Sequence, residues 1–215
     1  MHILTVDVTC RPDHCFLEAA DCCRFLAEYH PGRGSGDRFR QLIADFKCPP
    51  SVAALSPARL RRKRRAVATL AQALRAALAR STVEAATWVP IPPSSAEGDP
   101  DYDDRLLQTL RAAFAGCDLD LRLLLRQTGN MSPDHRAGTR IPREMLYARL
   151  RLDAAALALR PLRTRIILFD DLLVSGKHYK CCQRRLRESL PAIPISGWFI
   201  ARRVLPLRWR AGPRR

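Results

Sequence analysis

The stretch IILFDDLLVSGKH, residues 166–178, decides the fold class of this chain. It opens with an unbroken apolar run, which is typical of a parallel strand buried on both faces. Two acids, Asp170 and Asp171, follow directly, and a turn at Ser175 and Gly176 comes after them. These signals predict a strand over 165–169, a loop over 170–178 and a helix over 179–190.

This order of elements also predicts a binding site. In open α/β sheets, ligands bind beyond the carboxyl ends of the strands. A small-residue turn that leads into a helix offers backbone N–H groups to phosphate. Adjacent acids such as Asp170 and Asp171 can bind ribose hydroxyls or hold Mg²⁺ through water. The stretch therefore indicates a site for a phosphorylated sugar, and the structural alternative is that the two acids merely cap a turn or helix.

The rest of the chain alternates helical and strand-like patterns. Such alternation predicts an α/β layer with a mostly parallel sheet. We expect helices over 39–46, 56–80, 105–115 and 143–159, strands over 87–92 and 195–201, and either state for the apolar stretch 119–125. We divide the chain into an N-terminal mixed and helical region over 1–81, an α/β domain over 82–205 and a basic tail over 206–215.

The composition favours a folded, strongly basic protein. The chain has 215 residues, of which 47% are hydrophobic and 27% charged, so it can bury a sizeable core. A net charge of +16 predicts a positive surface field that attracts polyanions. The densest run lies at the start of an expected helix, where the candidate contacts to nucleic-acid phosphate are Arg59, Arg61, Arg62, Lys63, Arg64 and Arg65. A solvated basic face is the alternative interpretation of this run.

Membrane and redox signals point to the cytoplasm. No apolar run approaches the length that spans a membrane, and the first residues lack a secretory signature, so we expect a soluble, cytoplasmic protein without membrane contact. The chain has eight cysteines, and five of them lie early, at Cys10, Cys15, Cys22, Cys23 and Cys48. Their spacing is not that of a paired zinc module, although His14 lies between two of them. We interpret them as reduced, mostly buried thiols and assign no metal ligands, and a metal site of His14 with Cys10 and Cys15 is the alternative.

Residues 166–178 resemble the segment with which type I phosphoribosyltransferases bind phosphoribosyl pyrophosphate (PRPP). The shared features are the apolar strand, the two acids, two apolar residues and a turn rich in Thr or Ser and Gly. Three further segments resemble this family, especially its ComF-like branch of competence proteins: the strand and loop from 89, the segment 126–140 and the strand 197–202. The resemblance covers roughly residues 85–205. It implies a central, mostly parallel sheet flanked by helices, with a partly helical N-terminal extension.

The resemblance implies roles for the matching residues. Asp170 and Asp171 would contact the ribose hydroxyls, and the 5′-phosphate would be wrapped by Val174, Ser175, Gly176, Lys177 and His178. The pyrophosphate-side loop would contain Pro92, Pro93 and Ser94, and Mg²⁺ would bind together with PRPP. Arg105 is either a third catalytic residue or one half of a surface pair with Asp103. His135 and Arg140 would belong to a hood over the base.

The turn and the first loop differ from the family pattern. Ser175-Gly176-Lys177-His178 stands where the family has a Thr-Gly-Ala-Thr-like turn. Lys177 then offers a cation and His178 a donor to phosphate, or else both side chains fill the pocket. The acidic loop 99–104 replaces the Arg-Gly-Phe-Asn segment of the ComF-like branch. We expect these acids to repel pyrophosphate unless a metal bridges the two.

Three functional hypotheses follow. In the first, the chain binds PRPP or a ribose 5-phosphate nucleotide and transfers the phosphoribosyl group to an acceptor that the sequence does not identify. In the second, the same fold only senses PRPP or a nucleotide, while the basic run and the tail arginines grip nucleic acid in DNA uptake, regulation or phage defence; those arginines are Arg202, Arg203, Arg208, Arg210, Arg214 and Arg215. In the third, the chain is an effector that acts beside a partner protein. The oligomeric state stays open, with a dimer among the options.

Overall fold

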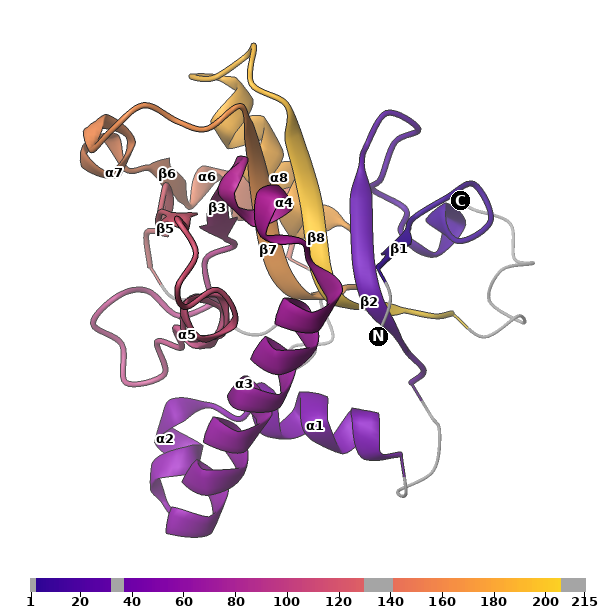
Figure 1. The fold of residues 1–215 in the computed structure, drawn as a ribbon, viewed down its shortest axis with the longest axis vertical. Helices are drawn as coiled ribbons and strands as arrows, with labels where there is room; N and C mark the ends of the chain where they lie inside the picture. Colours follow the sequence, from indigo (N-terminus) through magenta and orange to yellow (C-terminus); the bar gives the residue numbers. More distant parts are fainter. Residues whose placement is uncertain (1–2, 32–36, 130–140, 206–215) are drawn as a thin grey trace.

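The computed structural model describes residues 3–31, 37–129 and 141–205. Its centre is a six-stranded sheet in the order β1-β2-β8-β7-β3-β4 (Figure 1). The strands are β1 (Leu4–Thr5), β2 (Cys23–Tyr29), β8 (Ile195–Arg203), β7 (Arg165–Leu173), β3 (Ala86–Pro90) and β4 (Asp120–Leu121). Every pairing is parallel except that of β1 with β2. The prediction of an α/β fold with a mostly parallel sheet flanked by helices is therefore confirmed.

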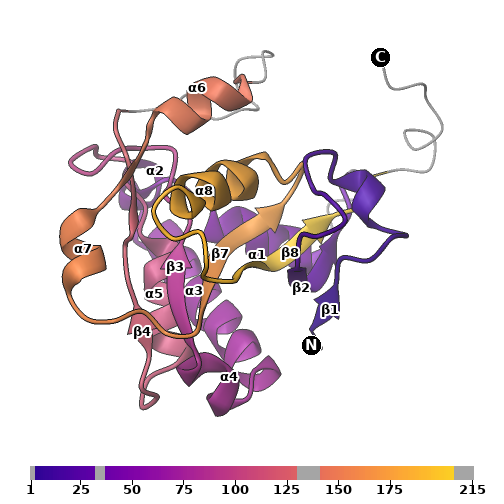
Figure 2. The ribbon, with the colours of Figure 1, turned by 90° about the horizontal axis from the view of Figure 1, so that it is seen from above.

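Helices cover both faces of the sheet (Figure 2). One face carries α1 (Arg38–Phe46), α3 (Pro57–Ala77) and α5 (Arg105–Ala113), whose apolar residues form one core cluster. The short helices α2 (Pro50–Ala54) and α4 (Arg80–Glu84) precede and follow α3. The opposite face carries α8 (Lys177–Arg187), which contributes to a second cluster. Both clusters bury residues of β7, so this strand lies in the middle of the molecule.

Side chains of β7 alternate between the two cores, as a strand requires. Ile166 and Leu168 belong to the cluster under α8, whereas Ile167 and Phe169 belong to the cluster under α1, α3 and α5. The strand is longer than the sequence predicts, because its pairing with β8 continues to Leu173 opposite Arg202. The expectation that residue 170 begins a loop is wrong: both acids lie within the strand and continue its alternation toward opposite faces.

The N-terminal residues contribute to the same sheet. β2 pairs with β8 from Cys23 opposite Gly197 to Tyr29 opposite Arg203. Residues on both sides of the expected boundary at 81 and 82 therefore share one sheet. The helix expected over 56–80 is α3, which begins directly after Ser56.

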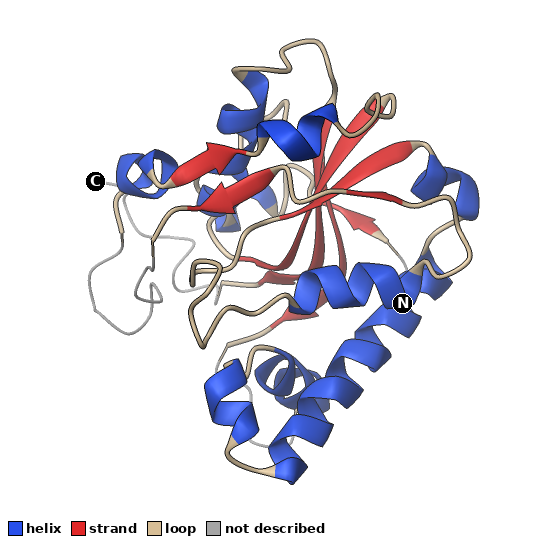
Figure 3. Ribbon diagram, turned by 90° about the vertical axis from the view of Figure 1, so that its left-hand side faces the viewer, coloured by secondary structure: helices blue, strands red, loops and turns tan. Residues whose placement is uncertain are grey.

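A smaller, two-stranded sheet lies apart from the central one (Figure 3). It pairs β5 (Leu125–Gln127) with β6 (Leu150–Leu152) in antiparallel register. The helix expected over 143–159 is wrong, because this segment forms α6 (Arg143–Ala148), then β6, then α7 (Ala154–Ala158). Cross-strand pairing with β5 outweighs the helical spacing, and the Asp153 side chain caps a new helix by accepting from the Ala156 N–H. The ambiguous stretch 119–125 contains β4 and the first residue of β5.

Half of the eight cysteines are buried: Cys10, Cys23, Cys181 and Cys182. Of the five early cysteines only Cys10 and Cys23 are buried, whereas Cys15 and Cys22 are exposed, so the expectation that most of the five are buried is wrong. Burial raises the pKa of the Cys23 thiol to about 12, so this thiol stays protonated. Within the described parts of the chain, no helix combines the length and apolar character needed to cross a membrane.

Candidate functional site

The order of the strands creates a switch point between β3 and β7. From β3 the chain crosses to β4 on one side, and from β7 it crosses to β8 on the other. The connecting helices, α5 and α8, accordingly lie on opposite faces of the sheet. The crevice beyond the carboxyl ends of two such strands is where open α/β sheets bind ligands. Asp170 and Asp171 lie in the last four residues of β7, and Pro92 lies two residues beyond β3.

Asp171 is buried and held by two cations. Its Oδ1 lies 3.0 Å from Nζ of Lys47, and its Oδ2 accepts from Nη2 of Arg105 at 2.6 Å and from Nε at 3.2 Å. The Asp171 side chain is 4% exposed. Burial alone would raise its pKa, but Lys47 and Arg105 outweigh that effect and hold the pKa well below its ordinary value. Asp171 is therefore an anion that anchors two cations beside the crevice.

This ion pair belongs to a larger buried network. Nη1 of Arg105 donates to Oδ2 of Asp103 at 2.8 Å, and the same oxygen accepts from Nζ of Lys63 at 2.7 Å. Lys63 also donates to the carbonyl oxygens of Phe46 and Cys48, at 3.1 Å and 2.8 Å. The network connects β7, α5, α3 and the end of α1. Arg105 is thus paired with Asp103 and at the same time with Asp171, but the expectation of a surface pair is wrong, because the Asp103 side chain is buried and that of Arg105 is mostly buried.

Asp170 has a different environment. It is half-buried, its Oδ1 accepts from the backbone N–H of Asp171 at 2.7 Å, and it forms no salt bridge within the described chain. Burial, and then the negative charge of Asp171, raise its pKa to about 7. Two neighbouring carboxyls whose pKa values are pushed apart can hold different protonation states at one pH, which is a frequent arrangement in functional sites.

The turn after β7 is packed against the N-terminal segment. Gly176 adopts φ +82°, and a Cβ added there would lie 2.8 Å from Cδ2 of Leu17. The Ser175 carbonyl accepts from the N–H of Phe16 at 2.9 Å. Nδ1 of the fully buried His14 lies 2.6 Å from the carbonyl oxygen of Val174, to which it must donate, because a carbonyl only accepts. Residues 14–17 therefore fix the shape of the expected phosphate loop.

The first turn of α8 offers backbone donors. The first bond of the helix runs from the Lys180 N–H to the Gly176 carbonyl at 3.0 Å, so the N–H groups of residues 177–179 bond to no carbonyl of the helix, and that of Lys177 lies 3.4 Å from Oγ of Ser175. The Lys177 side chain does not project from this turn. It is 5% exposed, and its Nζ donates to the Ile141 carbonyl at 2.7 Å. The expected phosphate contact from the Lys177 ammonium is therefore wrong, because this cation is engaged inside the protein, whereas His178 is half-buried.

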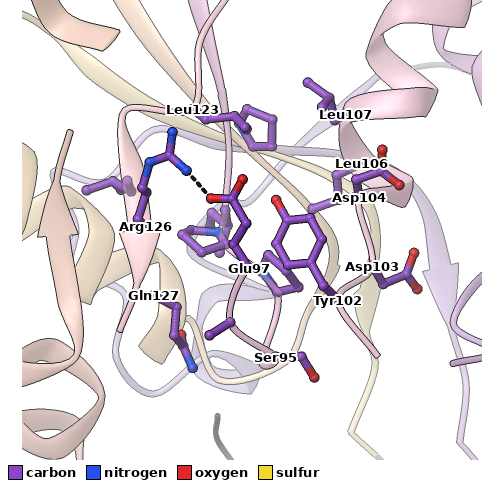
Figure 4. A pocket seen from close by; sticks show the side chains of 16 residues that line it. Ser95, Glu97, Tyr102, Asp103, Asp104, Leu106, Leu107, Leu123, Arg126 and Gln127 are labelled. Carbon is purple, nitrogen blue, oxygen red and sulfur yellow. Dashed lines mark hydrogen bonds and ion pairs between the residues drawn. The ribbon is translucent and has the colours of Figure 1, made fainter. Parts of the chain in front are cut away.

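A cavity of about 130 Å³ lies next to the loop that follows β3 (Figure 4). Pro92 and Pro93 line it, and the Ser94 carbonyl accepts from Nε2 of Gln127 at 3.0 Å. Apolar side chains form most of the wall: Ile91, Leu106, Leu107, Leu123 and Leu125. The cavity contains neither Asp170 nor the turn at 174–178. Asp103 connects the cavity to Asp171, because Asp103 lines the cavity and binds Arg105, which in turn binds Asp171.

A few polar groups enter this cavity. Figure 4 shows Glu97 and Tyr102 beside each other, with the Glu97 carboxylate turned toward Arg126, to which it is ion-paired. Burial, and then the charges of Glu97 and Asp104, raise the pKa of Tyr102, so its hydroxyl stays a hydrogen-bond donor. An apolar wall with a few convergent polar groups is typical of a small-molecule site. Sequence reasoning did not single out Glu97 or Tyr102, because neither belongs to a recognisable motif.

The acidic loop 99–104 is less repulsive than its sequence indicates. Oδ1 of Asp99 accepts from the Asp101 N–H at 2.7 Å, and Oδ1 of Asp101 accepts from the Ser51 N–H at 3.1 Å. Asp103 is neutralised by Lys63 and Arg105. The acids therefore shape the loop and tie it to α2 and α5.

The basic run of α3 divides into two groups. Arg59, Arg61, Arg62, Arg64 and Arg65 are exposed. Lys63 is 9% exposed and bound inside the ion network, so its prediction as a nucleic-acid contact is wrong. His135, Arg140 and the tail arginines from residue 206 onward lie outside the described residues. Arg202 is buried and ion-paired with Asp13, so its prediction as a nucleic-acid contact is wrong.

Lys47 is the residue that sequence reasoning missed at the acid pair. It stands directly after α1, about 120 residues before Asp171, and no local pattern signals the contact. Across the described ranges, no group of three or more His, Cys, Asp or Glu side chains is placed to hold a metal ion.

Comparison with known proteins does not identify a family for this chain. The chain matches no model of a known protein family, and no curated protein shows a significant sequence match to it. The arrangement of strands, acids and turn at the switch point is therefore what supports a functional assignment.

Proposed function

We propose that the chain binds the ribose 5-phosphate part of PRPP or of a nucleotide at the carboxyl end of β7. The switch point between β3 and β7 is the observation that carries this proposal, because Asp170, Asp171 and the N-terminus of α8 lie on the carboxyl-end side of these strands, where open α/β sheets bind ligands. The resemblance of residues 166–178 to the PRPP segment of type I phosphoribosyltransferases supports the same ligand.

The two acids take different roles in this proposal. Asp170 accepts hydrogen bonds from the ribose hydroxyls, because it is half-buried and carries no salt bridge within the described chain. Asp171 positions Arg105 and Lys47, whose charges attract a pyrophosphate group. The backbone N–H groups of residues 177–179 bind the 5′-phosphate, as a helix N-terminus does for anions.

Magnesium fits this arrangement as a companion of the ligand. Mg²⁺ sites often use one or two carboxylates together with substrate phosphates, so no cage of three side chains is needed. Asp170 is the carboxylate that can serve, whereas both oxygens of Asp171 are occupied. When bound, Mg²⁺ neutralises charge on pyrophosphate.

Transfer of the phosphoribosyl group is the reaction that this site would support. The C1–pyrophosphate bond breaks and pyrophosphate leaves with the bonding electron pair, while the lone pair of the acceptor nitrogen forms the new bond to C1 and that nitrogen releases a proton to water. Positioning and charge stabilisation would carry the catalysis. The cavity beside Pro92 and Tyr102 is the place for an acceptor ring, since its wall is mostly apolar.

Isothermal titration of PRPP, with and without Mg²⁺, tests the proposal. We expect Mg²⁺ to strengthen binding to the wild type and Asp170→Asn to weaken it at least tenfold. Asp118→Asn is the matched control. Asp118 is an exposed acid that precedes β4, so it lies at the amino ends of the parallel strands, away from the proposed site at their carboxyl ends. Absence of PRPP binding to the folded wild type, with or without Mg²⁺, would contradict the proposal.

A second measurement separates an enzyme from a sensor. Pyrophosphate release from PRPP is followed with a panel of nucleobases and with ammonia as acceptors. Release that depends on one acceptor and disappears in Asp170→Asn supports the transferase. If PRPP binds tightly but no acceptor leads to pyrophosphate release, the chain recognises PRPP without transferring the phosphoribosyl group, and the transferase hypothesis is contradicted.

A further inference from the structure

We propose that the exposed face of the first half of α3 binds the phosphate backbone of a nucleic-acid duplex. This surface, which we call the arginine face, consists of Arg59, Arg61, Arg62, Arg64 and Arg65. It is separate from the crevice at β7, so it adds a macromolecular partner to the proposed small-molecule site.

The helix has one buried side and one open side. Residues advance by about 100° around a helix axis. Ala66, Val67, Leu70 and Leu74 are buried and mark the inner side, which Lys63 shares. Arg61 and Arg65 lie one turn apart on the opposite side, and Arg62 and Arg64 flank them. The register of the core therefore directs Arg61, Arg62, Arg64 and Arg65 outward, whereas the exposed Arg59 lies one turn before Lys63, on the side that faces the core farther along the helix.

The charges of the arginine face are not compensated. Helix α3 contains no Asp or Glu over its 21 residues. Asp45 lies 3.4 Å from the half-exposed Arg62, and no ion pair of the other four arginines occurs among the described residues. A solvated helix commonly alternates charges and gains from pairs four residues apart. Cations in the first turns also oppose the helix dipole. The run thus weakens the isolated helix, and an anionic partner would offset that effect.

The chemistry of α3 favours a duplex over a single strand. Single-strand binders stack bases on aromatic rings, and α3 contains no aromatic residue. Arginines that contact phosphate position a protein without reading the sequence. From Arg59 to Arg65 the helix rises by about 9 Å, a length over which duplex DNA presents roughly five charges.

The placement of α3 allows such contact. Figure 1 shows the start of α3 beside α2, at the end of the molecule away from the sheet, with its other end close to the sheet. A helix of about 10–12 Å diameter also fits the major groove of DNA, which is about 12 Å wide. No rearrangement of the described residues is needed to bring the arginine face to a duplex.

Fluorescence anisotropy with the full-length protein tests the proposal. The probes are a labelled 20-base-pair DNA duplex of arbitrary sequence, the corresponding RNA duplex and the single DNA strand. For five phosphate contacts, we expect affinity for the duplex to fall about 500-fold between 50 and 200 mM KCl. In the variant Arg61→Gln, Arg64→Gln and Arg65→Gln, the same salt change should cost only about 12-fold, because three contacts are lost.

Three controls make the result decisive. The variant Arg111→Gln, Arg165→Gln and Arg187→Gln removes the same charge from exposed positions outside α3 and should keep the wild-type salt dependence. Circular dichroism shows whether each variant is folded. A poly-glutamate chain of equal charge tests for an acidic protein partner. Equal loss in both triple variants, absent duplex binding at 50 mM KCl, or tighter binding of the single strand or poly-glutamate would each overturn the proposal, whatever the outcome of PRPP titration.

Discussion

Oδ2 of Asp171 lies 2.6 Å from Nη2 of Arg105, and this contact fastens the end of β7 to the first residue of α5. Asp171 is almost fully buried, so its negative charge is stabilised by Arg105 and Lys47 instead of by water. Removing one partner of a buried ion pair commonly costs about 3–5 kcal/mol, because the other charge stays buried. The two acids of β7 should therefore respond differently to neutralisation.

Asp171→Asn should lower the free energy of unfolding by about 3–5 kcal/mol. Asp170→Asn should leave it unchanged or raise it, because burial and the charge of Asp171 already disfavour ionised Asp170. Urea denaturation at pH 8 measures both variants. Equal losses for the two variants would contradict the separation of a structural acid from a ligand-binding acid.

The pH dependence of stability should report Asp170. Its pKa rises from 3.8 in the unfolded chain to about 7 in the folded protein. Between these values the folded state binds more protons, so this group makes stability fall as pH rises from about 4 to about 7. The effect should vanish in Asp170→Asn, and the difference between wild type and variant isolates it. A difference that stays constant from pH 4 to pH 8 would show that the Asp170 pKa is not raised.

Asp171 should act in the opposite direction. The pKa of this carboxyl is lowered in the folded protein, so its contribution to stability is present above pH 4 and is lost as pH falls further. Acid unfolding followed by circular dichroism should therefore begin at a lower pH in wild type than in Asp171→Asn, which lacks this contribution. In Asp171→Asn, which is destabilised at neutral pH, stability should change less between pH 4 and pH 2.

Local patterns predicted the elements that are governed by local chemistry. The strand at the apolar run of β7 and the start of α3 at Ser56-Pro57 were predicted correctly, because burial and the preference of proline for the first helical position act within a few residues. The prediction of a single helix over 143–159 was wrong, since the middle residues of this segment pair with Leu125–Gln127, which lie far away in the sequence. The strand character of Cys23–Tyr29 in the central sheet is likewise set by β8.

The candidate site was predictable only in part. The acids and the turn stand next to each other in the sequence, so their common position could be predicted. The different environments of Asp170 and Asp171 could not, because they depend on Lys47 and Arg105 from other elements. The burial of Lys63 could not be predicted either. The six cations of the basic run look alike in the sequence, and only the register of α3 against the core turns Lys63 inward while the five arginines stay exposed.

Neighbouring cations of α3 should therefore differ sharply on substitution. Lys63→Met removes the partner of Asp103 and of two backbone carbonyls, and we expect it to cost about 3 kcal/mol or more. Arg64→Gln, one residue along, should change stability by less than about 0.5 kcal/mol, because Arg64 is exposed. Urea denaturation compares them. Folded Lys63→Met should bind duplex DNA with the affinity of the wild type, whereas Arg64→Gln should lower the affinity for duplex DNA.

Gly176→Ala tests whether residues 14–17 fix the phosphate loop. The new methyl group would meet the Leu17 side chain at 2.8 Å, and the backbone at φ +82° is unfavourable for alanine. We expect a loss of about 2–4 kcal/mol in unfolding free energy, of which about 1–2 kcal/mol is backbone strain. Gly98→Ala is the matched control, because Gly98 has φ +91° but nothing within 4 Å of the added Cβ, so only the strain applies. Adding Leu17→Ala to Gly176→Ala should cost less than Leu17→Ala costs alone, since it relieves the clash. Equal losses for Gly176→Ala and Gly98→Ala in urea denaturation would show that Leu17 does not constrain the turn.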